Sequence, residues 1–454
     1  MASHTASQRY PSTRGGSYDV KLAFEVFSLY ILPSEIPSAD LKDLIKRSYS
    51  TFRDPGVAPI VTLDKEKNIH LLELFHGPTF AFKDESGKTG RDREHLTVIR
   101  ATSGDTGSAA IYASPVQEAQ MTTVMDANVH NLVVDGTFDD CQSLITSQDF
   151  VKALFADPKI NKTHRLAAIN SINFSRILAQ ITYYFTHPLT LLCLRRHNLL
   201  RRAHRQFGER EVQEEALHGA DAAGGLPEDG AQAHGDGVKE TLSPAMDILV
   251  SSNFERLLWY LAYSVCNTPS TPTPERRATA GTHVRSRLSA IKTDGGFAVD
   301  EAIVAAARAD FESECVSDEE TLSTTSAVYN APSPAMAQTA AAGTTGAGYT
   351  LDPHSAVGIT AALRSAARNP VPRTHHVSLA TAHPAKFSRA VEMALQGAYG
   401  FSFDAVLPEE FRGLEDKPGR VTVAKKGEGW EGVRRIVVAE VEAERAAAEN
   451  KGMT

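Results

Sequence analysis

The stretch LTVIRATSGDTGSAAIYA, from Leu96 to Ala113, is the part of the sequence that decides the fold class. It begins with an apolar, β-branched run, continues through a turn of small residues and ends in residues that favour a helix. A strand, a glycine-rich turn and a helix in this order form the repeating unit of an α/β protein. We therefore expect an α/β fold.

The same order of elements returns elsewhere in the chain. Residues 128–157 predict a strand that ends at Val134 and is followed by a turn and a helix, and residues 375–395 predict a further strand, turn and helix. Apolar residues at helical spacing predict two helices near the N-terminus, over residues 21–32 and 39–52. The repetition supports the α/β class and adds an N-terminal helical region.

Two stretches lack the pattern of a packed element. Residues 187–236 are rich first in Arg and then in Ala, Gly and Asp, a composition that buries little apolar surface. Ser, Thr, Pro and Arg predict a linker near residues 267–285. We accordingly expect an N-terminal domain, a small α/β domain, a divergent low-complexity segment and an incomplete C-terminal α/β domain, with the ranges 1–95, 96–186, 187–236 and 237–454.

The composition excludes several classes of protein. Hydrophobic residues make up 42% of the chain and charged residues 22%, which are values of a globular protein, and the net charge of −8 argues against a general nucleic-acid surface. The four cysteines form no Cys-x-x-Cys pair, so we expect neither a zinc site nor a disulfide framework. The longest apolar run, Leu189–Leu194, is too short to cross a bilayer. We expect a cytoplasmic protein with no membrane partner.

Lys83 is the first candidate for chemistry. It follows residues 69–82, which predict a buried strand that is broken at Gly77 and Pro78. A lysine beside two phenylalanines is often an amphipathic residue whose ammonium group reaches water. In the alternative interpretation, apolar surroundings lower the pKa of the amine and make it a nucleophile for a carbonyl group.

Two turns near Lys83 contain residues that could hold an anion. The sequence SGKT, Ser86–Thr89, resembles a phosphate loop, but Phe82 occupies a position where such a loop needs a small residue, so we interpret it as a solvated loop. The sequence SGDTG, residues 103–107, lies in a strand-to-helix turn, where backbone N–H groups can approach an anion. A plain tight turn is the alternative there.

The order of short motifs along the chain is the most specific signal in the sequence. The motifs are HGPTFAFKD (76–84), ATSGDTGSAAIY (101–112), PVQEAQMTTV (115–124), GTFDDCQ (136–142), NSIN (170–173), LSPAMDILVSSNFERLLWYLA (242–262), YTLDPHSAVG (349–358) and LATAHPAKFSRAV (379–391). In this order they resemble the threonine synthase family in its fungal and bacterial long form. The resemblance covers most of residues 18–186, 237–265 and 310–415.

The resemblance implies a fold, a cofactor and a reaction. The fold is that of tryptophan synthase β, pyridoxal 5′-phosphate (PLP) fold type II, with two open α/β domains around the cofactor and an N-terminal helical region. The reaction converts O-phospho-L-homoserine and water into L-threonine and phosphate, and no metal is implied. Lys83 would be the Schiff-base lysine and the base that moves protons along the substrate carbons, while the cofactor ring acts as electron sink.

The resemblance also assigns binding residues. The family's turn beside the cofactor and the substrate, where donors hold the anionic ends of the substrate, is matched by Ser103, Gly104, Asp105, Thr106 and Gly107. Thr381 matches the hydroxyl group that meets the pyridine nitrogen. A polar cluster near the site, for which a helix cap is an equal alternative, is matched by Asn170, Ser171 and Asn173. Of these three, we assign Asn173 to the cofactor.

Three departures from the family pattern begin and end abruptly beside sequence that matches the family well. Polar residues follow Lys83 where the family has an apolar helix, Tyr112 and Pro115 leave no room between them for a further strand, and residues 187–236 contain no glycine-rich phosphate cup. These abrupt boundaries favour loss or mistranslation of coding segments over gradual divergence. The missing phosphate cup and the missing apolar helix predict weak cofactor binding and reduced stability. The glycines of DAAGGLPEDG are a candidate substitute for the cup. The sequence predicts no apolar strand before them and no helix after them, which favours a low-complexity segment without this role.

Two alternative functions remain open on this sequence. The same lysine supports a phospholyase that acts on O-phosphohomoserine and releases 2-oxobutyrate. The missing phosphate cup favours a catalytically inactive, threonine-synthase-like protein that serves in binding or assembly.

Overall fold

The fold is described from a computed structural model. The described residues are 20–80, 97–99, 131–134, 153–154, 156–160, 166–168, 182, 231–233, 241–243, 254–265, 271–294, 296–311, 314–331, 348–368, 374–413 and 421–450. The helices are α1 (Val20–Phe27), α2 (Ser38–Tyr49), α10 (Phe254–Val265), α11 (Thr273–Asp294), α12 (Glu301–Asp310), α13 (Asp318–Asn330), α14 (Pro353–Arg368), α15 (Ser388–Leu395), α16 (Phe403–Val406) and α17 (Gly429–Asn450). The strands are β1 (Ile60–Asp64), β2 (Ile69–Glu73), β3 (Thr97–Ile99), β4 (Asn131–Val134), β5 (Leu166–Ala168), β6 (Ala231–Ala233), β7 (Gly296–Ala298), β8 (His376–Ala380) and β9 (Val421–Ala424).

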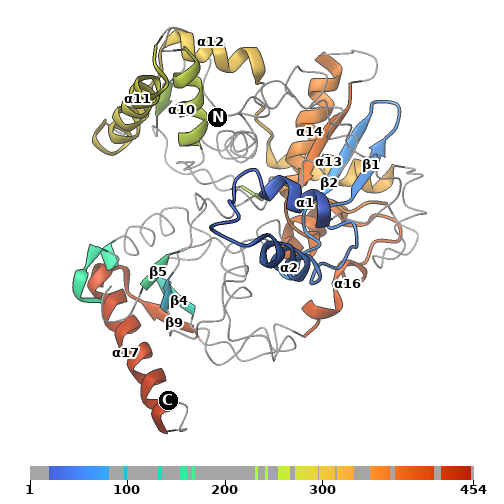
Figure 1. The fold of residues 1–454 in the computed structure, drawn as a ribbon. Coiled ribbons are helices and arrows are strands. Elements are labelled where there is room, and N and C mark those ends of the chain that lie inside the picture. Colours follow the sequence, from blue (N-terminus) through green and yellow to red (C-terminus); the bar gives the residue numbers. More distant parts are fainter. Residues whose placement is uncertain are drawn as a thin grey trace.

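A three-stranded sheet with the order β1-β2-β8 joins segments that are far apart in the sequence (Figure 1). Strand β1 pairs antiparallel with β2, whereas β2 pairs parallel with β8, with Ile69 opposite His376 and Glu73 opposite Ala380. The expected strands after residues 69 and 375 are therefore confirmed. They lie side by side although one belongs to the expected N-terminal domain and the other to the expected C-terminal domain.

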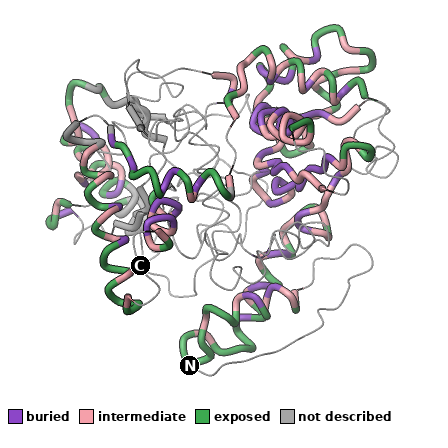
Figure 2. Tube along the Cα trace, turned by 90° about the horizontal axis from the view of Figure 1, so that it is seen from above, coloured by how far each residue is buried: buried purple, intermediate pink, exposed green. Residues whose placement is uncertain are grey.

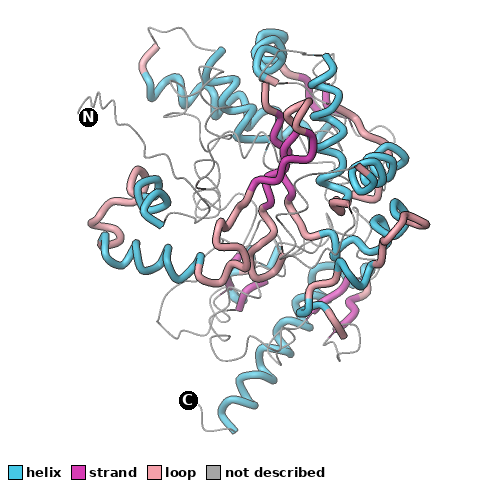
Figure 3. Tube along the Cα trace, turned by 90° about the vertical axis from the view of Figure 1, so that its right-hand side faces the viewer, coloured by secondary structure: helices cyan, strands magenta, loops and turns pink. Residues whose placement is uncertain are grey.

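Helices cover both faces of this sheet (Figure 3). The side chains of β2 alternate between the two faces. Leu72 packs with α1 and α2 through a cluster that includes Ile45, while Leu71 packs with α14 through a cluster that includes Ile359. Every residue of β2 is buried, as expected for a strand that is covered on both faces. The arrangement of helix, sheet and helix confirms the α/β class.

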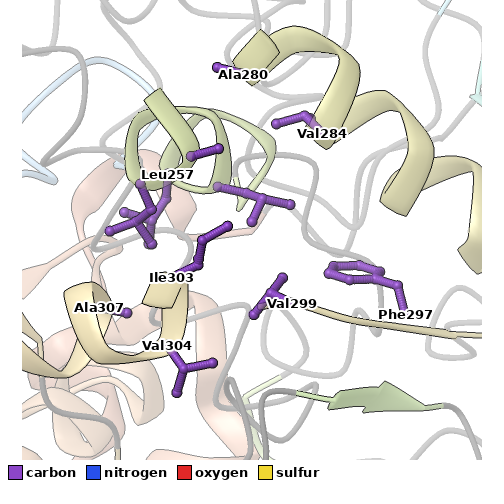
Figure 4. Packing of buried hydrophobic residues seen from close by; sticks show 11 residues of the cluster. Leu257, Ala280, Val284, Phe297, Val299, Ile303, Val304 and Ala307 are labelled. Atoms are coloured by element: carbon purple, nitrogen blue, oxygen red, sulfur yellow. The ribbon is translucent and has the colours of Figure 1, made fainter. Parts of the chain in front are cut away.

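A second core lies among α10, α11 and α12 (Figure 4). Leu258 and Ile303 are fully buried there, and Phe297 of β7 packs against the same cluster. Helix α11 occupies most of the range near 267–285 for which the composition predicts a linker, so that prediction is wrong. Ala280, Val284 and Leu288 repeat at intervals of four residues and supply the apolar stripe that packs α11 against the cluster.

Short two-stranded sheets lie in other parts of the described chain. The parallel pairs are β3 with β5 and β4 with β9, so the strands predicted near Ile99 and Val134 are confirmed. Strand β6 lies inside the segment 187–236 and pairs antiparallel with β7, so that segment contributes one short strand to the fold. The sequence of residues 169–185 predicts an amphipathic helix, and all of this stretch except residue 182 lies outside the described residues.

Buried and exposed residues alternate along the helices, as Figure 2 shows in purple and green. In α2, for example, Leu41, Ile45 and Tyr49 are buried at intervals of four residues. Among the described helices, none combines the length and the apolar character that a bilayer crossing requires.

Candidate active site

The carboxyl ends of β2 and β8 form the part of the candidate site that the structure describes. Because the two strands are parallel neighbours, the chain leaves both at the same edge of the sheet, where ligands of open α/β folds bind. Pairing extends one residue beyond β2, since the N–H of Leu74 donates to the carbonyl of Ala380 at 2.9 Å. From this edge one segment leads to Lys83 and the other to Thr381.

The two segments are tied together beyond the sheet. The N–H of His383 donates to the carbonyl of Phe80 at 3.0 Å. The His383 ring meets Phe75 and Phe80 edge-on, with ring centroids 5.3 and 5.4 Å apart. The segment that precedes Lys83 by three residues is therefore held against the segment that carries Thr381.

His383 is electrically neutral in this setting. Burial lowers the pKa of its imidazole to about 3, and the charges of His76, Arg53 and Lys386 act in the same direction. Its Nδ1 accepts a hydrogen bond from the N–H of Ala385 at 3.2 Å, so the ring proton is on Nε2. His383 thus joins the two segments without adding a positive charge to the site.

Glu73 is a buried carboxylate at the end of β2 with partners on both oxygens. The Tyr349 hydroxyl donates to Oε1 at 2.6 Å, and Nε2 of His76 lies 2.7 Å from Oε2. Burial raises the pKa of Tyr349 well above its ordinary value, and the charge of Glu73 raises it further. Tyr349 is therefore a neutral donor, and the network fixes the chain on either side of the sheet edge.

Asp352 anchors the start of α14 beside this network. Its Oδ1 accepts hydrogen bonds from the N–H groups of His354 at 2.9 Å and Ser355 at 3.2 Å, and its Oδ2 accepts one from the Ser355 hydroxyl. These bonds satisfy N–H groups that have no partner within the helix. The motif YTLDPHSAVG thus supplies both the tyrosine that binds Glu73 and the aspartate that begins α14.

Comparison with known proteins identifies the family. A family model described as "Threonine synthase, C-terminal" matches residues 355–437. The threonine synthase of Saccharomyces cerevisiae is 42% identical over 448 residues, which cover 87% of this chain and 82% of the relative. This chain belongs to the threonine synthase family. The family expected from the order of motifs is confirmed.

Solved structures of this family have the same fold. The crystal structure of threonine synthase from yeast is 37% identical, with a TM-score of 0.71, and the match covers 94% of this chain and 89% of that chain. The PLP-bound threonine synthase from Brucella melitensis is 29% identical, with a TM-score of 0.64 and the same coverage of both chains. The fold type expected from the resemblance is therefore confirmed.

Of the site residues expected from the threonine synthase motifs, Thr381 lies within the described part. It directly follows β8 and is half-buried, and none of the hydrogen bonds among the described residues uses its hydroxyl group. A hydroxyl group that can donate or accept fits the ring nitrogen of a pyridine cofactor, whereas the nearby carboxylate of Glu73 is engaged by its two partners.

The other expected site residues lie outside the described residues. They are Lys83, Ser103, Gly104, Asp105, Thr106, Gly107, Asn170, Ser171 and Asn173. Within the ranges that the structure describes, no group of three or more His, Cys, Asp or Glu residues could hold a metal ion.

The sequence does not predict several residues that the structure places at the sheet edge. These are Glu73, Tyr349 and His383, although each lies within or shortly before one of the family motifs. One signal was available for Glu73, since an acidic residue within an otherwise apolar strand needs buried partners.

Proposed function

We propose that this chain is a PLP-dependent threonine synthase, which converts O-phospho-L-homoserine and water into L-threonine and phosphate. Membership of the threonine synthase family supports the reaction and the cofactor. The observation that carries the proposal is the sheet edge at which the segment leading to Lys83 is bonded to the segment with Thr381. This edge bonds the segment that precedes Lys83 in the sequence, as far as Phe80, to the segment that carries Thr381.

Lys83 would hold the cofactor covalently and would serve as the base that moves protons along the substrate carbons. An amine does this well when its surroundings favour the neutral form, and the segment before Lys83 is lined by Phe75 and Phe80, which are both buried. The bound cofactor supplies an electron sink for the carbanions of the reaction.

The remaining residues hold and orient the reacting groups. The Thr381 hydroxyl would hold the pyridine nitrogen as a neutral partner that does not force that nitrogen to carry a proton. Backbone N–H and hydroxyl groups of the turn from Ser103 to Gly107 hold the anionic ends of the substrate. Asn173, with Asn170 and Ser171 beside it, adds polar contacts near the cofactor.

The partner of the protein is a small phosphorylated amino acid, and the site of action is the cytoplasm. The net charge of −8 supports the absence of a nucleic-acid partner. The wide spacing of the four cysteines fits a reducing compartment, and Cys315 is a free thiol in the described part of the chain.

The reaction is tested by its product balance. The purified chain, loaded with PLP and given O-phosphohomoserine, is expected to release phosphate and threonine in equal amounts, and Lys83→Ala is expected to release neither. Phosphate accompanied by 2-oxobutyrate would identify a phospholyase. No product from a chain that has bound the cofactor on Lys83 would identify an inactive binding protein.

A further inference from the structure

Arg53 contacts the turn that precedes Lys83. Its N–H donates to the carbonyl of His76 at 2.8 Å, so the backbone after α2 is bound to the start of this turn. Its guanidinium group donates to the carbonyl of Gly77 and, at 3.2 Å, to the carbonyl of Pro78. One side chain thus binds two successive carbonyl groups of the turn.

The same guanidinium group also fixes the Phe80 side chain. Its central carbon lies 3.6 Å from the centre of the Phe80 ring, in a cation–π contact. On another side the Phe80 ring meets the Phe411 ring edge-on, with centroids 4.7 Å apart. Phe80 is therefore enclosed by Arg53, Phe411 and His383, which come from three separate segments of the chain.

Glu410 holds Arg53 in place. Nε of Arg53 donates to Oε1 of Glu410 at 2.9 Å, and the guanidinium group pairs with the same oxygen at 2.9 Å. Partial burial opposes ionisation of Glu410, but hydrogen bonds from its own backbone N–H and from Arg53 hold the pKa of this carboxyl group below its ordinary value. The carboxylate therefore stays charged and directs the guanidinium group toward the turn.

Phe80 has a backbone conformation that needs such support. Its φ is +59°, in the left-handed region, where the Cβ atom of a non-glycine residue crowds the backbone. Residues persist in this region when the surrounding structure determines their conformation. Three contacts on the Phe80 ring and the bond from His383 to its carbonyl provide that determination.

We propose that Arg53 is a positioning residue for Lys83: it fixes the turn at Phe80 and so sets the direction in which the chain reaches the cofactor. This inference rests on the proposed role of Lys83. Lys83 lies three positions after Phe80 in the sequence, a reach of about 10 Å in extended chain, so a rotation at Phe80 would displace the lysine amine by several ångströms. The fork of the guanidinium group binds both carbonyl groups and the ring at once, which a lysine ammonium group cannot do.

The test uses two variants and a matched control. Arg53→Lys keeps the charge but removes the fork, and Glu410→Gln keeps Arg53 but weakens its support. Arg47→Lys is the control, because Arg47 lies on α2 and pairs with Asp43 in an exposed i,i+4 contact. Each protein is measured for PLP affinity, for the fraction of bound cofactor that borohydride fixes on Lys83, and for amide exchange of Phe80 without cofactor.

In Arg53→Lys we expect about tenfold weaker PLP binding, a smaller fixed fraction and faster exchange of the Phe80 N–H, which bonds to the Gly77 carbonyl. Glu410→Gln should change the same quantities less, and Arg47→Lys should match the wild type. Equal labelling, affinity and exchange in all four proteins would overturn the role of Arg53. Absence of a Lys83 adduct in the wild type would instead overturn the proposed function, because the inference would then have no lysine to position.

Discussion

The sheet edge at β2 and β8 and the helical cluster of α10, α11 and α12 are both buried, but different side chains fill them. The edge encloses the polar groups of Glu73, Tyr349 and His383 beside phenylalanine rings. The cluster consists of apolar side chains such as Leu257 and Ile303 (Figure 4). Apolar packing needs the right volume, whereas each buried polar group needs a partner at a set distance and angle. The edge therefore has few permitted arrangements, as a site that orients reacting groups requires.

The largest expected effect concerns the phosphate group of PLP. Residues 187–236 contain no glycine-rich cup for this phosphate, and each missing charge-assisted hydrogen bond is worth about 1.5–3 kcal/mol. Replacing residues 187–230 by a glycine-cup segment, while keeping β6, should strengthen PLP binding by about two orders of magnitude or more. Titration with PLP, followed by absorbance and by melting temperature, measures the change.

The unaltered chain is the control for this replacement. The same affinity and the same cofactor-induced stabilisation in both chains would show that the cup is dispensable, and that residues 187–236 are not a damaged part of the protein.

A cavity in the helical cluster should change stability and leave cofactor binding unaltered. Leu258 is fully buried, so Leu258→Ala should lower the free energy of unfolding by about 3 kcal/mol. Leu29→Ala removes the same atoms at a site where the side chain is 64% exposed, and should cost less than about 0.5 kcal/mol. Denaturant unfolding and PLP titration of both variants provide the measurement. A loss of PLP affinity in Leu258→Ala at temperatures where it is folded would contradict the separation of the two regions.

A smaller effect should appear in the pH dependence of stability. The folded-state pKa of His383 is about 3, below the ordinary value of 6.5, so at intermediate pH the unfolded chain binds a proton that the folded chain does not. Stability contributed by neutral His383 is thus lost as the pH falls from 6.5 toward 3, by about 1.4 kcal/mol per pH unit.

The variant His383→Phe keeps an aromatic ring but removes the imidazole group that binds this proton. Its free energy of unfolding should fall less steeply than that of the wild type between about pH 6 and pH 4, by the equivalent of one proton. Parallel pH profiles for the two proteins would show that His383 accepts its proton as readily in the folded state as in the unfolded state.

The two regions also differ in how far the sequence predicts them. Strands β2 and β8 have clear local signals, because each combines one β-branched residue with leucine in a short stretch, and a turn that contains proline follows each strand. Helix α11 has a weak signal, since Thr, Pro and Arg dominate its start and its apolar stripe is narrow. The composition near residues 267–285 therefore predicted a linker, whereas packing against α10 determines a helix.

The contacts of the site depend on distant parts of the chain. Thr381 could be assigned because it lies within a short family motif. The partnership of Arg53 with Glu410 and that of Glu73 with Tyr349 join residues 357 and 276 positions apart. No local pattern marks such pairs, because the fold alone brings them together.

The most direct test of the account is the identity of the lysine that binds the cofactor. The chain is incubated with PLP, reduced with borohydride and digested, and the modified peptide is identified by mass spectrometry. We predict a single modified lysine, Lys83, which follows the apolar segment of β2 and Phe80 in the sequence. Modification of Lys88, in the charged stretch that follows, would contradict the assignment of the site.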